Sequence, residues 1–305
     1  MPEKMIETTF PAQVNNIVIV GTGLMGTGIA QVAVESGVHV TMVGRTEEKC
    51  EGARTKISNG VNKTAKRKLA NESPETQQGF VSTTLANLEF VTDVFSANLD
   101  STDMVVEAVV ENLKVKQKLF TDLEAVVPSH CLLVTNTSSF LLEEVSCKMG
   151  ERRKNFGGLH FFNPVPAMKL VEVVRGLETS DEAYDSLFRL CQRIGKQPVR
   201  CKDSPGFIVN RLLMPYLADA MRLAESGDAE VKDIDTAMRL GTGHPMGPFE
   251  LMDYIGLDTM KFILDGWHQR MPEDHRYTPC NSLEKLVSAG KLGRKTGEGF
   301  HRYAK

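Results

Sequence analysis

The chain has 305 residues, a length that allows about two domains and a substantial core. Hydrophobic residues make up 41% and charged residues 25%, as in an ordinary globular protein, and no apolar run approaches the ~18 residues that span a membrane. The formal net charge of −3 argues against a nucleic-acid-binding surface, so affinity for an anionic ligand must come from a local cluster of basic side chains.

The first predicted elements are a strand, a glycine-rich turn, a helix and a second strand. Residues 16–20 are mostly β-branched and predict the first strand, and residues 38–43 predict the second. The turn between them fits G-x-G-x-x-G, by which Rossmann domains bind the pyrophosphate of a dinucleotide at a helix N-terminus. The flanking elements favour this interpretation over a purely structural turn. The predicted cofactor-binding residues are Gly21, Gly23, Leu24, Met25 and Gly26.

The end of the second strand departs from the usual NAD pattern. An acidic residue there commonly binds the 2′-hydroxyl of the adenosine ribose, but this chain has Gly44 followed by Arg45. Without the carboxylate there is no repulsion of a 2′-phosphate, and Arg45 is able to pair with one. Alternatively, Arg45 is a solvated loop residue and NAD binds more weakly. From these residues alone, NAD and NADP stay equally open.

The middle of the chain predicts strands that alternate with helices. A polar, basic helix is expected over 47–71, and a helix over 112–126 has apolar residues on one face. Alternation of this kind is typical of a parallel sheet. The further strands are predicted at 88–91, 104–109, 131–135, 156–161 and 170–174.

A histidine and a glutamate lie on the last two of these strands. A hairpin centred near residue 166 would place His160 roughly opposite Glu172. An imidazole titrates near neutral pH, and a carboxylate beside it fixes its tautomer and stabilises the imidazolium. The pair is therefore suited to removing a proton from an alcohol while a cofactor accepts the hydride.

The pattern changes near residue 203, after which only helical periods remain. We therefore predict an α/β, Rossmann-type doubly wound, mostly parallel sheet in residues 1–203 and a smaller all-helical domain in 204–305. The first helix of that domain has a broad apolar surface, which predicts a homodimer. Its members are Leu212, Leu213, Tyr216, Leu217, Ala220 and Leu223.

The six cysteines are scattered and form no C-x-x-C, as expected for reduced thiols of an intracellular protein without a zinc site. The N-terminus has no secretory apolar core and no arginine before Arg45, unlike a mitochondrial transit peptide. The C-terminus is not a peroxisomal address. A cytoplasmic location is therefore compatible with these features, although a trimmed presequence would leave the same N-terminus.

From about Asn16 to Tyr303 the chain closely resembles the short-chain L-3-hydroxyacyl-CoA dehydrogenases of fatty-acid β-oxidation. The motifs that carry the resemblance are long and specific: GTGLMGTGIAQVA, VVEAVVENLKVK, GLHFFNPVPAMKLVEVV, CKDSPGFIVNRLL, GHPMGPFELMDYIGLDT and GRKTGEGF. The resemblance implies an NAD-dependent homodimer that acts on acyl-CoA, in the mitochondrial matrix.

The resemblance also implies roles for individual residues. His160 would be the general base and Glu172 its electrostatic partner. Ser138 and Asn210 would hold the reacting oxygen and the imidazole, and Asn163 would position the nicotinamide side. Matches to family positions that contact the cofactor are Glu111, Lys116 and Lys295.

Two features differ from the family pattern. Gly44 replaces the usual aspartate, and in the helix that faces CoA Gly60 replaces a serine and Arg67 a lysine. That helix stays basic, so Lys66 and Arg67 suit the CoA phosphates, unless they form a solvated face. Two alternatives stay open: an NADP-dependent dehydrogenase of a small free hydroxy acid, and a non-enzymatic dinucleotide-binding protein.

Overall fold

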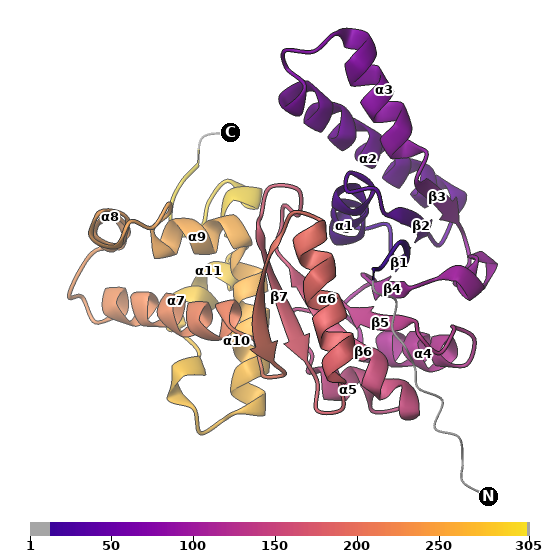
Figure 1. Cartoon of the computed structure of the whole chain (residues 1–305). Helices are drawn as coiled ribbons and strands as arrows, with labels where there is room; N and C mark the ends of the chain where they lie inside the picture. Colours follow the sequence, from indigo (N-terminus) through magenta and orange to yellow (C-terminus); the bar gives the residue numbers. More distant parts are fainter. Residues whose placement is uncertain (1–12, 304–305) are drawn as a thin grey trace, which may run out of the picture. The chain divides into compact units, whose positions relative to one another are not determined.

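The computed structural model describes residues 13–303, which form two compact units (Figure 1). The first unit ends at Phe207 and the second begins at Ile208, shortly after the predicted boundary at residue 203. The N-terminal residues that bear on the compartment lie outside the described residues.

The first unit is built on a sheet whose described strands follow the order β3-β2-β1-β4-β5-β6-β7-β8. All neighbouring strands are parallel except β6 and β7, which form the expected antiparallel hairpin. Helices cover both faces, so the central strands are apolar throughout rather than alternating. The strands are β1 (Asn16–Val20), β2 (His39–Val43), β3 (Leu88–Val91), β4 (Met104–Glu107), β5 (Leu132–Thr135), β6 (Phe156–Phe161), β7 (Leu170–Arg175) and β8 (Gln197–Lys202).

Two apolar clusters lie on the two faces of this sheet. One face packs against α1, α2, α3 and α6, and the other against α4 and α5. Full burial of one large aliphatic side chain contributes about 1.5–3 kcal/mol, so these clusters hold the strand ends in place. The helices are α1 (Leu24–Val34), α2 (Glu47–Lys68), α3 (Pro74–Leu85), α4 (Leu113–Glu124), α5 (Leu142–Ser146) and α6 (Asp181–Arg193).

Helix α3 and strand β8 were not predicted from the sequence. Helix α3 has a regular start, with Ser73 as N-cap and Pro74 in the first turn, but buries only Val81 and Thr84. Its polar sequence therefore lacks the apolar period of a core helix. Strand β8 lies at the sheet edge and contains Pro198, which a strand accepts only in such a position.

The described part of the second unit has helices and no strand, as predicted, with two isolated β-bridges near its end. Its core packs side chains of α7, α9, α10 and α11 together. The predicted apolar surface of α7 is only partly free within the unit: Leu217 and Ala220 are buried, whereas Leu212 is 71% exposed. No helix of the described chain is long and apolar enough to cross a membrane. The helices are α7 (Val209–Glu225), α8 (Val231–Thr242), α9 (Pro248–Ile255), α10 (Leu257–Arg270) and α11 (Asn281–Ser288).

The cysteines of the described chain differ sharply in accessibility, and this gives a test of the packing. Cys147 is exposed and the other five are buried. Burial raises the pKa of the Cys131 thiol to about 12, so Cys131 stays protonated and unreactive at pH 8, where a thiolate is the nucleophile. We expect one fast equivalent of thiol labelling in the native protein. Cys147→Ser should abolish it, and fast labelling of a second cysteine would contradict this packing.

Candidate active site and cofactor pocket

The glycine-rich turn has two positions where only glycine fits against the backbone, and a third that leaves space for a ligand. Gly21 has φ +124°, and a Cβ atom there would lie 2.3 Å from the carbonyl oxygen of Ala108. A Cβ on Gly26 would lie 2.1 Å from the carbonyl oxygen of Gly21, so the helix packs directly on the turn. A Cβ on Gly23 would have no atom within 4 Å. The turn is therefore closed toward the protein and open toward a pocket, as pyrophosphate binding requires.

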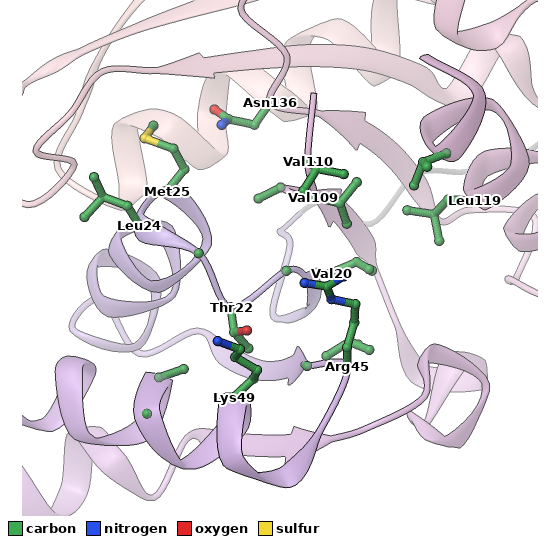
Figure 2. A pocket seen from close by; sticks show the side chains of 18 of the residues that line it. Val20, Thr22, Leu24, Met25, Arg45, Lys49, Val109, Val110, Leu119 and Asn136 are labelled. Atoms are coloured by element: carbon green, nitrogen blue, oxygen red, sulfur yellow. The ribbon is translucent and has the colours of Figure 1, made fainter. Parts of the chain in front are cut away.

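A pocket of about 1000 Å³ lies beside this turn at the carboxyl ends of the parallel strands (Figure 2). Open α/β sheets bind ligands at this edge, and the volume suits a dinucleotide. Gly26 packs beneath the turn instead of lining the pocket. The predicted residues that line it are Gly21, Gly23, Leu24, Met25, Gly44, Arg45, Glu111 and Ser138.

Lys116 is buried in an ion network below the pocket and does not line it. Its side chain is 1% exposed. The ammonium donates to both carboxylate oxygens of Glu107, at 2.7 and 2.8 Å, and lies 2.9 Å from Glu111 Oε2. Glu107 also accepts from the hydroxyl of Thr135 at 2.7 Å and the amide of Val109 at 2.8 Å. Lys116 is thus linked to the pocket through Glu111.

Glu111 fixes the loop that carries Ser138. Its Oε1 accepts the backbone N–H groups of Ser138 and Ser139, both at 3.2 Å, and the hydroxyl of Thr137. The Ser138 hydroxyl is exposed on the pocket wall. These charge-assisted hydrogen bonds tie the loop to Glu111, so the carboxylate positions the backbone of Ser138 beside the pocket.

His160 and Glu172 form the predicted pair across the β6–β7 hairpin. They are directly opposite in the strand register, and Nδ1 of the imidazole lies 2.6 Å from Glu172 Oε2. The exposed fraction is 6% for His160 and 0% for Glu172. The rings of Phe162 and Phe207 flank the imidazole, with centroids 4.5 and 5.4 Å away. With Nδ1–H directed at the carboxylate, Nε2 carries the lone pair that accepts a proton.

Asn136 connects the pocket to this pair. It lines the pocket, and its Oδ1 accepts the backbone N–H of Phe161, next to His160, at 3.0 Å. Strands β5 and β6 align Thr135 with Gly158, so the loop after β5 leaves the sheet near the level of His160. The pocket and the proton acceptor thus belong to one edge of the sheet.

The remaining predicted residues lie elsewhere. Asn163 is exposed on the turn after β6. Lys66 and Arg67 are exposed at the end of α2. Asn210 and Lys295 belong to the second unit, where Lys295 lies 2.5 Å from Asp258.

Sequence reasoning missed the structural role of Glu107 and the pocket position of Lys49. The available signal for Glu107 was its position at the end of the apolar run Met104–Glu107. A carboxylate buried there needs a partner of opposite charge. Lys49 lies one turn after Arg45, within the polar, basic helix predicted over 47–71, and received no role of its own from the sequence. No cluster of three or more His, Cys, Asp or Glu side chains in residues 13–303 is able to hold a metal ion.

Comparisons with known proteins cover nearly the whole chain. Residues 16–204 match the family model described as 3-hydroxyacyl-CoA dehydrogenase, NAD binding domain, and residues 206–303 match the model of the C-terminal domain of the same enzymes. The mitochondrial hydroxyacyl-coenzyme A dehydrogenase of Rattus norvegicus is 50% identical over 95% of this chain and 91% of its own length.

A relative from Caenorhabditis elegans, described as a probable 3-hydroxyacyl-CoA dehydrogenase, is 49% identical over 96% of this chain and 94% of its own. Among solved structures, (S)-3-hydroxybutyryl-CoA dehydrogenase from Ralstonia eutropha has a TM-score of 0.88 and 35% identity, over 96% of this chain and all of the other.

Proposed function

The chain belongs to the 3-hydroxyacyl-CoA dehydrogenase family, and we propose that it interconverts L-3-hydroxyacyl-CoA and 3-oxoacyl-CoA by hydride transfer to and from a nicotinamide dinucleotide. The observation that carries this proposal is the buried His160–Glu172 pair, 2.6 Å apart, on the same sheet edge as the glycine-lined pocket. A proton acceptor and a dinucleotide site are the two parts that oxidation of an alcohol requires.

His160 is the proposed general base. In the oxidative direction Nε2 takes the proton of the 3-hydroxyl group, and the imidazolium that forms is stabilised by the Glu172 carboxylate at Nδ1. In the reductive direction the same nitrogen returns the proton to the forming alkoxide. Because the pair is buried, water does not screen the attraction between the Glu172 carboxylate and the ring.

The pocket beside the glycine turn is proposed to hold the cofactor, which when bound supplies the hydride acceptor or donor. Gly21 and Gly23 provide the open turn for the pyrophosphate, and Ser138 lines the same pocket on the loop that Glu111 holds. We propose that Ser138 and Asn210 orient the reacting oxygen and the imidazole. Asn163 is proposed to position the nicotinamide, and Lys295 to contact the cofactor.

The coenzyme A part of the substrate is assigned to the basic end of α2. Lys66 and Arg67 are exposed there, next to Lys68 in the last turn of the helix. A guanidinium and an ammonium both bind phosphate, and a free hydroxy acid would need no such surface. This observation favours an acyl-CoA substrate over a small free acid.

We further propose a homodimer and a mitochondrial compartment. The second unit exposes large apolar side chains, among them Leu212 at 71%, Leu240 at 83% and Phe262 at 72%, and such side chains are typical of an interface. The related enzymes of Rattus norvegicus and Homo sapiens are described as mitochondrial. Light scattering after size exclusion and cell fractionation test the two proposals.

The activity is tested by nicotinamide absorbance at ~340 nm with acetoacetyl-CoA, in parallel with NADH and NADPH. We expect rapid oxidation of at least one reduced cofactor and none with free acetoacetate. Turnover of acetoacetate as fast as of its CoA ester would favour the free-acid alternative. Binding of a cofactor without any turnover would favour a non-enzymatic dinucleotide-binding protein.

A further inference from the structure

The corner between β2 and α2 places basic side chains in the cofactor pocket. Arg45 and Lys49 both line the pocket, and Figure 2 shows them with Thr22 around the same part of it. Both side chains are exposed. Within residues 13–303, neither forms an ion pair with a carboxylate. Two cations that line a ligand pocket and are in no ion pair indicate that the ligand is anionic at that point.

The position that would hold an acidic residue is closed by packing. A Cβ on Gly44 would lie 2.5 Å from Cys50 Sγ and 3.0 Å from Thr22 Cγ2. Cys50 is itself buried against the end of β3, where its thiol approaches the carbonyl oxygen of Val91 at 3.5 Å. An aspartate at residue 44 would therefore require Cys50 to move. The chain therefore lacks the carboxylate that binds the ribose, and Cys50 occupies the space that this side chain would need.

The end of the second strand of a Rossmann sheet faces the adenosine ribose. We propose that Arg45 and Lys49 bind the 2′-phosphate of NADP(H), so that this chain prefers NADP(H) to NAD(H). The inference rests on the proposed cofactor pocket and deepens it by naming the dinucleotide. The guanidinium of Arg45 offers a planar pair of donors and Lys49 a second positive charge from the next turn, which together suit a phosphate dianion.

Glu48 is the group that opposes this assignment. It lines the same pocket and immediately precedes Lys49 in the chain. If Glu48 instead accepted a hydrogen bond from a free 2′-hydroxyl, the corner would favour NAD(H). Its carboxylate lies on an exposed helix turn, where two neighbouring cations outweigh one anion. Glu48→Gln separates the two assignments, because it should strengthen NADPH binding if the phosphate is bound and weaken NADH binding if the hydroxyl is bound.

The test is the dissociation constant of NADPH and of NADH, measured by nicotinamide fluorescence without substrate. We expect NADPH to bind at least about tenfold more tightly, the scale of one charge-assisted hydrogen bond. Arg45→Gln and Lys49→Gln should each weaken NADPH binding about tenfold and change NADH binding less than about twofold. Lys63→Gln, on the same helix and exposed outside the pocket lining, is the matched control and should change neither.

A second probe isolates the phosphate. The nucleotide 2′,5′-ADP lacks nicotinamide and should compete with NADPH far better than 5′-AMP in the parent chain, but not in the Arg45→Gln, Lys49→Gln double variant. The inference is overturned if NADH binds as tightly as NADPH or more tightly, or if neither dinucleotide binds. It is also overturned if the double variant binds NADPH as the parent chain does. Absence of turnover with acetoacetyl-CoA, despite selective NADPH binding, would reject the proposed activity and leave the phosphate site standing.

Discussion

Replacing His160 by glutamine is expected to lower kcat by about 10²–10⁴-fold, the usual contribution of a positioned general base. Glutamine has similar volume, so it should keep the packing between Phe162 and Phe207, but its amide does not accept a proton at neutral pH. The cofactor pocket does not include His160, so the dissociation constant of the dinucleotide should change little. Steady-state kinetics and nicotinamide fluorescence measure the two effects separately.

His39 provides a matched control for this variant. It is also a strand histidine beside a glutamate, with Nε2 3.7 Å from Glu89, but its side chain is 38% exposed and lies at the start of β2. His39→Gln should leave kcat within about twofold, since surface substitutions usually have small effects. Wild-type turnover in the His160 variant would show that another group accepts the proton.

The largest effect on stability is expected for Lys116→Met, at about 3–5 kcal/mol of unfolding free energy. Methionine matches the length of lysine but leaves Glu107, which is 0% exposed, without its counter-charge. The remaining donors from Thr135 and Val109 are neutral and do not replace the ammonium. Urea unfolding, read by circular dichroism, gives the difference from the shift of the midpoint at constant slope.

Lys118→Met tests whether the effect comes from burial. Lys118 lies on the same helix and pairs with Asp122 at 2.7 Å, but its side chain is 78% exposed. An exposed pair of this kind contributes about 0–1 kcal/mol. Similar losses in both variants would mean that the Lys116 network adds no more than a surface ion pair.

The hairpin shows what the sequence was able to predict. The proline-rich turn near residue 166 separates two apolar runs of similar length, and this alone fixed the pairing of His160 with Glu172 that the structure confirms. The glycine spacing likewise predicted the turn, because Gly21 and Gly26 meet backbone oxygens that exclude a Cβ atom, while Gly23 leaves the pocket side of the turn open. Local patterns of this kind need no knowledge of distant residues.

The network of Lys116 could not be predicted in the same way. Its partner Glu107 ends a different element, and only the packing of α4 over the ends of β4 and β5 brings the charges together. Burial of the lysine is equally non-local, because the apolar period of α4 gives no sign that Lys116 is buried beside Phe120 and Leu123. The basic face of α2 was similarly ambiguous: periodicity did not show that Lys49 faces a pocket while Lys63 faces solvent.

Burial also divides the lysines of this chain by chemical reactivity. A CoA thioester is an acylating agent, and a protein that works among thioesters exposes its surface amines to slow modification. Lys116 is protected, because its side chain is 1% exposed and its nitrogen is enclosed by the carboxylates of Glu107 and Glu111. Lys49 has no such protection. Acylation there would remove one positive charge from the cofactor pocket, so part of the chemical ageing of this protein would fall on its nucleotide site and not on its core.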